Sequence, residues 1–332
     1  MPNKKITKAI FVNGGSGRVL SSIPAFEKLV KINEKTDEDF IIVCEGNDEL
    51  FLNNKLLHKR LYTTEHKNLF RDFIKKSTVI TPEPYRNKAY YNQECNIAQG
   101  FDLEINGTMS KNQEEYRATI ELTQSEITKG KLFVDDIKNQ AQKSNVVVFQ
   151  PFGSGVTSEN GRIFDSSGRS ISYENVIRIL EAINKDSLVF IMSDIDLPTP
   201  SHLKVGTLKG SLREWAAVIN EADHFLGCDS VGQHIAFCLN KPCTVIFGST
   251  YPENVGYSGA KNYNIIDLGK ENREYSPIRI LQDTRVDMNN ENCFKVTDNN
   301  IKEISKNIEE TFNNSKIPNF TSNKCDTRKC CK

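Results

Sequence analysis

Apolar residues in the first part of the chain form short runs that end in turns. Residues 6–13 alternate like a strand and end in Gly14-Gly15-Ser16-Gly17, after which residues 19–30 show helical spacing. A second apolar run, residues 40–44, stops at Glu45. This order predicts a strand, a tight turn, a helix and a parallel strand, as at the start of a Rossmann-like domain.

The middle of the chain has a weaker pattern. Residues 81–128 are polar and irregular, which predicts loops and short elements. Residues 131–142 predict a helix, and the polar stretch 140–145 is a candidate interdomain linker. We therefore expect an N-terminal domain over 1–143, a C-terminal domain over 144–298, and a helix with a polar tail over 299–332.

The second half alternates more regularly between buried-strand runs and amphipathic helices. Strands are predicted at 146–149, 188–192, 224–227 and 243–247, and helices at 172–183, 211–220, 230–239 and 300–312. Right-handed crossovers in this order give a doubly wound parallel α/β sheet, with ligands at the carboxyl ends of the strands.

Composition favours a water-soluble protein of two ordinary domains. Of the 332 residues, 38% are hydrophobic and 26% charged, and no apolar run reaches the roughly 18 residues of a membrane-spanning helix. The N-terminus lacks the apolar core of a secretory signal, so we expect a cytoplasmic protein; the alternatives are attachment to the inner membrane face or, if the protein is virus-encoded, the host cytoplasm. Nine cysteines, several in apolar surroundings, indicate reduced thiols.

Charge is balanced overall but not locally. Lys and Arg number 43, as do Asp and Glu, which argues against a generally basic nucleic-acid binder. Residues 55–88 contain nine basic and three acidic residues, a net charge of +6. This stretch is either a footprint for an anionic partner or a solvated face.

Two predicted turns carry groups that suit a nucleotide. Gly153, Ser154 and Gly155 follow a strand and bring backbone N–H groups and a hydroxyl toward a phosphate. Asp194 follows the next strand, where a carboxylate accepts hydrogen bonds from ribose hydroxyls. The Asp194-x-Asp196 spacing also fits a metal motif, but such pairs commonly cap a strand, and we predict no metal.

Two further turns complete the predicted edge. Asp229 and Ser230 open a helix that carries Gly232 and His234, and a helix N-terminus attracts phosphate. Asp229 would equally serve as an N-cap, and a lone helical histidine is often structural. Ser249 and Thr250 form the fourth turn, while Ser211 is predicted to cap the helix that Leu212 begins.

The second half resembles a known family. The run from Leu212 to Ala236, with Asp223-His-Phe-Leu-Gly-Cys-Asp229-Ser230-x-x-x-His234, and the following Lys241-Pro242 and Phe247-Gly248-Ser249-Thr250-x-Pro252 resemble the heptosyltransferase-type glycosyltransferases of family 9. The resemblance is specific over 205–252, and looser at 150–155 and at Gly17-x-Val19.

This resemblance implies two Rossmann-like domains facing each other across a cleft, the GT-B arrangement, with the donor bound in the C-terminal domain and the acceptor mainly in the N-terminal one. It also implies inverting, metal-independent transfer from a nucleotide-diphosphate sugar, which is a substrate, so no cofactor is expected. The residues expected at the donor site are Gly15, Gly17, Gly153, Ser154, Gly155, Asp194, Ser211, Leu212, Asp229, Ser230, Gly232, His234, Ser249 and Thr250.

One departure concerns the general base. Many family members have an aspartate where this chain has Arg18, and arginine stays protonated. Arg18 would instead bind the donor diphosphate or an acidic acceptor. An attacking hydroxyl must still lose its proton, and Glu45, Asp102 and Glu104 are candidate bases because they follow strand-like or turn segments. The alternative is a sugar-nucleotide-binding protein without catalysis.

The sequence also allows a different cofactor, a zinc site and more than one acceptor. Gly15-x-Gly17-x-x-Leu20 with Glu45 imitates a dinucleotide fingerprint of an NAD-dependent oxidoreductase, but its third glycine is missing. Cys325, Cys330 and Cys331 are expected to be terminal thiols rather than zinc ligands completed by Cys293. The acceptor would be a phosphorylated surface glycan such as the lipopolysaccharide core, or a hydroxylated DNA base if the protein is virus-encoded.

Overall fold

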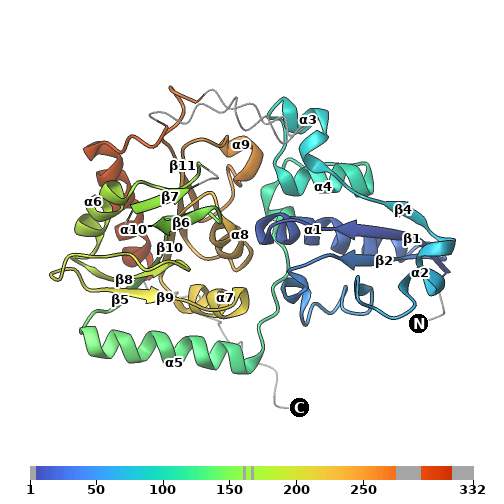
Figure 1. Cartoon of the computed structure of the whole chain (residues 1–332), viewed down its shortest axis with the longest axis horizontal. Coiled ribbons are helices and arrows are strands. Elements are labelled where there is room, and N and C mark those ends of the chain that lie inside the picture. The colour runs from blue at the N-terminus through green and yellow to red at the C-terminus, as the bar shows by residue number, and fades with distance from the viewer. Residues whose placement is uncertain (1–4, 160–161, 166–167, 274–292, 316–332) are drawn as a thin grey trace, which may run out of the picture.

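The structure, a computed structural model, describes residues 5–159, 162–165, 168–273 and 293–315. They form two α/β units side by side, each built on a parallel sheet (Figure 1). No helix in these ranges is long and apolar enough to cross a membrane. The architecture is the predicted pair of Rossmann-like domains.

The N-terminal sheet has four parallel strands in the order β3-β2-β1-β4. Helix α1 connects β1 to β2 as predicted, and its apolar face is buried from Val19 to Val30. The strands are β1 (Lys5–Val12), β2 (Glu38–Cys44), β3 (Leu61–Thr63) and β4 (Thr78–Ile80), and α1 spans Ser16–Asn33. Residues following β1 and β4 leave the sheet at the same carboxyl edge.

The segment expected to be irregular contains a well-defined helix, α4 (Ile97–Asn106). Asn96 and Gln99 form a capping box at its start, and Phe101 is buried. The prediction failed because Gly100 lowers helix propensity, while the tertiary structure requires it: a Cβ there would lie 2.8 Å from Pro84 Cβ. The shorter elements of this domain are η1 (Asp48–Phe51), α2 (Leu69–Asp72), η2 (Ile74–Lys76), η3 (Pro84–Arg86), α3 (Lys88–Tyr91) and η4 (Gln113–Tyr116).

Helix α5 (Gln124–Ala141) begins earlier than expected and belongs with the other half of the molecule. Thr123 and Glu126 form its capping box. It runs along α7 (Leu212–Glu221), so closely that a Cβ on Gly130 would lie 2.6 Å from the Ala217 carbonyl oxygen (Figure 1). The chain thus crosses to the C-terminal half before α5, and not at the linker that we predicted over 140–145.

The C-terminal sheet has six parallel strands in the order β12-β11-β10-β5-β8-β9. Every strand and helix predicted in this half is present. The strands are β5 (Asn145–Gln150), β8 (Ser187–Met192), β9 (Val205–Leu208), β10 (His224–Cys228), β11 (Cys243–Phe247) and β12 (Tyr263–Asp267); the remaining helices are α6 (Tyr173–Ile183), α8 (Val231–Cys238), α9 (Pro252–Val255) and α10 (Asp298–Ser315).

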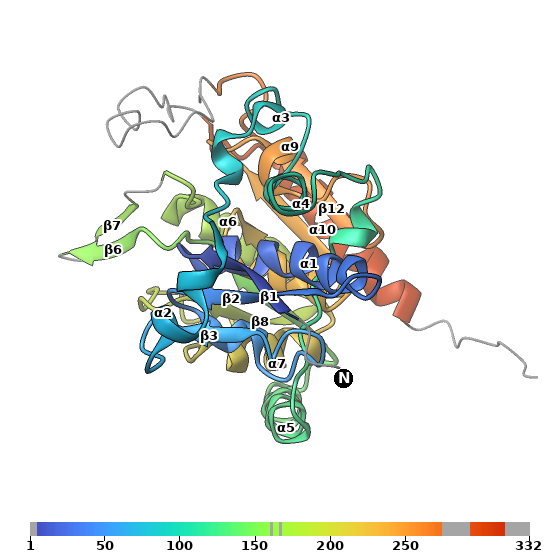
Figure 2. The same cartoon turned by 90° about the vertical axis from the view of Figure 1, so that its right-hand side faces the viewer.

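The sequence pattern missed β9, β12 and an antiparallel hairpin of β6 (Val156–Glu159) and β7 (Arg162–Asp165). β9 and β12 are sheet edges with only a few apolar residues, and the hairpin projects from the body of the molecule (Figure 2). Elements that bury little apolar surface leave a weak hydrophobic pattern.

Polar contacts join the two halves. Asn96 Nδ2 donates to the Gly256 carbonyl oxygen at 2.8 Å, and Asn254 Nδ2 donates to the Tyr90 carbonyl oxygen at 2.7 Å. The guanidinium of Arg117 also lies 4.2 Å from the centroid of the Phe237 ring. The hydrogen bonds donated by the two asparagine side chains are both buried, so they fix the relative position of the halves better than exposed contacts would.

Candidate functional site

Three loops leave the C-terminal sheet at neighbouring positions on its carboxyl edge. β10 lies between β5 and β11, and all three strands are parallel. The loops that follow them begin at Pro151, Asp229 and Gly248. Because ligands of doubly wound sheets bind at this edge, these three predicted turns lie where a donor would bind, and the fourth, after β8, leaves the strand next to β5.

Arg169 links two of these loops, and sequence reasoning did not identify it. Its Nη2 donates to Ser154 Oγ at 3.2 Å, and its Nη1 lies 3.8 Å from Asp229 Oδ2. Asp165 holds the segment in place by accepting from the backbone N–H groups of Arg169 and Ser170 at 2.8 and 2.7 Å. A half-buried guanidinium at this edge suits a phosphate group.

The start of α8 differs from the expected arrangement. Ser230, and not Asp229, is the N-cap residue, and no side-chain bond caps the helix. Asp229 is buried and accepts from Gln233 Nε2 at 2.7 Å. The Ser230 hydroxyl is therefore not used to cap the helix, and it remains a candidate donor to a phosphate.

Gly232 has a packing role, contrary to the prediction that it binds the donor. Its N–H donates to Gln150 Oε1 at 2.9 Å. A Cβ on Gly232 would lie 2.5 Å from that oxygen and equally close to the Phe225 ring. The glycine lets α8 approach β5 and β10, and its N–H is already bonded within the protein.

His234 is a buried residue of α8 that contacts Tyr257 and the N-terminal domain. Its Nδ1 lies 2.8 Å from the Tyr257 hydroxyl, and the side chain is buried. Burial lowers the pKa of His234 to about 4, so the imidazole is neutral at pH 7. The ring lies against Gly17 of the N-terminal domain, which places His234 at the junction of the two domains.

The hydroxyls of the predicted phosphate loops differ in availability. Ser170 Oγ accepts from the Gly153 N–H at 2.9 Å, and Ser249 Oγ donates to the Gly168 carbonyl oxygen at 2.6 Å. Thr250 Oγ1 is shielded from solvent and has no hydrogen-bond partner in the described part of the chain. A buried hydroxyl without a hydrogen-bond partner lowers the stability of the fold, so Thr250 is a candidate ligand-binding residue in addition to Ser154.

Ser211 and Leu212 lie toward the other end of the sheet, whereas Asp194 follows β8, the neighbour of β5. Ser211 caps α7, where its side chain and that of Glu214 form a capping box. α7 follows the edge strand β9, which is separated from β10 by β8 and β5. Asp194 is exposed after β8, and the described residues contain no cluster of His, Cys, Asp or Glu suited to a metal.

In the N-terminal domain, Gly15, Gly17 and Glu45 lie on the loops predicted for them. Glu45 is exposed after β2, and its Oε2 accepts from Asn13 Nδ2 at 3.0 Å. A Cβ on Gly15 would meet no atom within 4 Å, whereas one on Gly17 would collide with His234. Gly17 is therefore a domain-contact residue, and Gly15 borders open space.

Arg18, expected to bind the donor diphosphate or an acidic acceptor, contacts residues of its own domain. Its Nη1 lies 3.3 Å from Glu83 Oε2, and its Nη2 donates to the Pro82 carbonyl oxygen at 3.0 Å. The guanidinium carbon lies 5.3 Å from the centroid of the Tyr85 ring and 5.7 Å from that of Phe101. Aromatic packing and the ion pair together hold the side chain.

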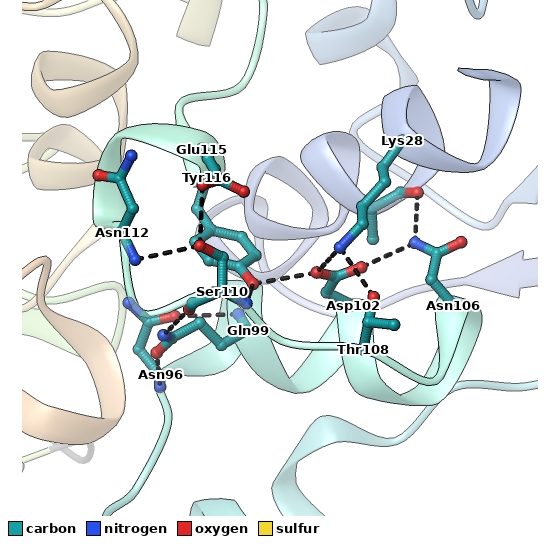
Figure 3. Close-up of polar contacts among 11 residues, drawn as sticks. Lys28, Asn96, Gln99, Asp102, Asn106, Thr108, Ser110, Asn112, Glu115 and Tyr116 are labelled. Atoms are coloured by element: carbon teal, nitrogen blue, oxygen red, sulfur yellow. Dashed lines mark hydrogen bonds and ion pairs between the residues drawn. The ribbon is translucent and has the colours of Figure 1, made fainter. Parts of the chain in front are cut away.

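Asp102 and Glu104 lie within α4, so our reason for proposing them as bases was wrong. Asp102 is 1% exposed and accepts from Lys28 Nζ at 2.6 Å, Asn106 Nδ2 at 2.9 Å and the Tyr116 hydroxyl at 3.0 Å (Figure 3). Its carboxylate is fully engaged in holding α1 and the 108–116 loop against α4. Glu104 is exposed and accepts from Asn87 Nδ2 at 3.0 Å.

The cysteines considered as zinc ligands and the basic stretch 55–88 are the remaining candidates. Cys325, Cys330 and Cys331 lie outside the described residues, whereas Cys293 is described and buried. In the basic stretch 55–88, Arg60 is ion-paired with Asp39. The lysines of this stretch are all exposed: Lys55, Lys59, Lys67, Lys75, Lys76 and Lys88.

The C-terminal domain matches a known protein family in sequence. Residues 207–277 match the model of glycosyltransferase family 9 (heptosyltransferase). This match covers α7, β10, α8, β11 and the turns at Asp229 and Ser249. No curated protein sequence matches the chain significantly.

Solved structures match the fold of nearly the whole chain. A family 9 glycosyltransferase from Veillonella parvula is 11% identical, with a TM-score of 0.65, and the match covers 93% of this chain and 99% of that structure. The E. coli ADP-heptose lipopolysaccharide heptosyltransferase II is 12% identical, with a TM-score of 0.53 over 92% of this chain and 99% of its own.

A third structure contains a nucleotide sugar. The iron-containing, dodecameric heptosyltransferase TibC, in complex with ADP-D-β-D-heptose, is 12% identical to this chain, with a TM-score of 0.53 and coverage of 94% and 76%. At these identities the structures establish the fold, and the sequence match lies at the predicted donor edge. Residues 207–277 thus carry the sequence pattern of glycosyltransferase family 9, and the chain as a whole has the two-domain GT-B fold of these solved structures.

Proposed function

We propose that this protein transfers a sugar, with inversion, from a nucleotide-diphosphate sugar bound at the carboxyl edge of the C-terminal sheet to an acceptor hydroxyl on the N-terminal side. The observation that carries the proposal is the position of Arg169. Its guanidinium lies between Ser154 and Asp229, which belong to two loops of that edge. An arginine beside a hydroxyl is a typical phosphate-binding pair.

The donor diphosphate would contact groups from all three loops. Arg169 supplies positive charge. The Ser230 hydroxyl does not cap α8, and the Thr250 hydroxyl has no hydrogen-bond partner among the described residues, so both can donate to the diphosphate. As the bond to the sugar breaks, negative charge grows on the leaving diphosphate, and a fixed guanidinium stabilises it. A metal ion is not required in this scheme, so we expect full activity in excess EDTA.

An ADP-linked heptose is the first donor to test, since the matched TibC structure holds ADP-D-β-D-heptose. Differential scanning fluorimetry of the full chain with ADP-heptose, UDP-glucose, GDP-mannose and NADH would identify the nucleotide. We expect at least one sugar nucleotide to raise the melting temperature. Stabilisation by NADH alone would support an oxidoreductase instead.

The acceptor is proposed to be anionic. Six exposed lysines from the stretch 55–88 lie on the N-terminal domain, the side expected to bind the acceptor. A phosphorylated glycan is the acceptor we favour, and a hydroxylated base in DNA is the alternative. Duplex DNA binding that falls steeply with added salt would favour DNA.

Transfer itself is tested by mass spectrometry of the products. The stabilising donor is incubated with phosphorylated core oligosaccharide or hydroxymethylated DNA, and release of nucleotide diphosphate is measured in parallel. A sugar-sized mass increase of either acceptor identifies it. Donor binding without nucleotide release would instead identify a sugar-nucleotide-binding protein.

A further inference from the structure

The pair of Arg18 and Glu83 lies at the carboxyl edge of the N-terminal sheet. β4 runs parallel to β1, with Ile80 opposite Ile10, so the segments after these two strands emerge together. Arg18 follows β1 and Glu83 follows β4. Gly17, the neighbour of Arg18, is in contact with His234 of the donor domain, so the pair adjoins the domain junction.

The hydrogen-bonding capacity of this pair is only partly used. Arg18 Nη1 and Glu83 Oε2 are 3.3 Å apart, a single long contact where two parallel bonds are possible. Arg18 Nε and Glu83 Oε1 are both shielded from solvent and have no partner within the described ranges. Since buried polar atoms are normally bonded, these two atoms point to a polar group that binds between or beside them.

We propose that Glu83 is the general base of the transfer reaction and that Arg18 positions it; this inference rests on the function proposed above. The Glu83 side chain is 38% exposed, so a rotation of its carboxyl group would present Oε1, which is shielded here and has no bond among the described residues, to an acceptor. The three carboxylates suggested by the sequence are less suitable. Asp102 is buried in its own network, Glu104 lies on a helix, and Glu45 is held by Asn13.

The chemistry balances without another reactant. The acceptor hydroxyl donates its proton to the Glu83 carboxylate while its oxygen forms a bond to the anomeric carbon of the donor. The bond from that carbon to the diphosphate oxygen breaks, and the nucleotide diphosphate leaves with the electron pair. Protonated Glu83 then returns its proton to water.

The test compares Glu83→Gln with Glu45→Gln in the full chain. Glutamine keeps a carbonyl oxygen for the bond from Arg18 but cannot take a proton. With the donor identified by fluorimetry, we expect Glu83→Gln to lower nucleotide release about 100- to 10,000-fold, with unchanged stabilisation by the donor. Glu45→Gln should stay within about threefold of wild type, and Glu83→Asp should recover part of the activity.

Arg18 is tested by the division of its effect between kcat and KM. We expect Arg18→Ala to lower kcat with the donor KM unchanged, and Arg18→Lys to recover part of kcat, because a cation again faces the carboxylate. Urea unfolding midpoints equal to wild type show that the Glu83 variants are folded. If Glu83→Gln turns over within threefold of wild type, this inference alone is overturned. If the wild-type chain binds no sugar nucleotide, or binds one without releasing nucleotide diphosphate, both the proposed function and this inference are overturned.

Discussion

Gly17 of the N-terminal domain lies directly against the His234 imidazole of the C-terminal domain. A Cβ on Gly17 would be 2.9 Å from His234 Cδ2 and 3.1 Å from its Nε2. Gly17 belongs to the first turn of α1, and His234 to the helix that begins beside Asp229. The absence of a side chain at one position is thus what allows the two domains to meet at the donor helix.

Gly17→Ala should weaken this junction. Real Cβ atoms essentially never come within 3.0 Å of a heavy atom of a residue that is not their chain neighbour, so α1 or His234 must shift, at a cost of about 1–3 kcal/mol in the free energy of unfolding. Urea unfolding measures the change.

Gly15→Ala is the matched control two residues away. Its φ of −68° suits alanine and its Cβ would meet nothing within 4 Å. The reduced entropy of the unfolded chain offsets the poorer N-cap, so we expect a change within about 0.5 kcal/mol. Equal losses for both variants would contradict the contact.

Arg169→Ala should weaken donor binding more than it weakens the fold. We expect a loss of about 1.5–3 kcal/mol in donor binding, roughly a 10- to 100-fold rise in Kd, from the lost charge-assisted hydrogen bond. Isothermal titration calorimetry measures it. Lys209→Ala is the control, because Lys209 is exposed after β9 and pairs with Asp196 at 2.8 Å. Equal donor affinity in the two variants would remove Arg169 from the site.

Asp102→Ala should destabilise the protein without affecting turnover per folded molecule. The substitution leaves Lys28, Asn106 and Tyr116 without their shared acceptor. Breaking a buried pair costs about 3–5 kcal/mol, but Lys28 is 37% exposed and can be solvated, so we expect about 2–3 kcal/mol. Glu104→Gln, on the exposed face of the same helix, should change stability by less than about 0.5 kcal/mol. Normal stability with lost turnover in Asp102→Ala would restore Asp102 as a base.

Stability should fall as the pH drops below about 6.5. Burial lowers the pKa of His234 to about 4 and that of His224 to about 3, so the unfolded chain takes up protons first. The stabilisation from their neutral forms is complete above pH 6.5 and is lost toward pH 4, by up to about 3 kcal/mol for His234. Glu126, whose pKa Arg213 lowers to about 2, contributes only below about pH 4.5.

Urea midpoints between pH 8 and pH 5 therefore isolate the histidines. The His234→Gln variant should show a shallower decline than wild type over that range. A wild-type midpoint that stays constant down to pH 5 would be inconsistent with two buried neutral imidazoles.

Local sequence patterns predicted much of the fold. The strands β5, β8, β10 and β11 of the C-terminal sheet follow from their apolar runs, and the cap of α7 at Ser211 follows from residue types within one turn of each other. α4 was missed because its stability comes from packing on α1 and Pro84, with Gly100 opposing the local propensity. α5 was assigned to the wrong half because the surface that covers it, α7, lies far along the chain.

The sequence by itself determined the alternation of strands and helices and the loops at one edge of the C-terminal sheet, because strand direction and burial are encoded within a few residues. Only the tertiary structure decided which side chains meet there. It brought Arg169 to Asp229, turned Arg18 toward Glu83 across 65 positions, and enclosed Asp102 with Lys28 across 74. Such pairs depend on how separate elements pack, and no local pattern of residues specifies that packing.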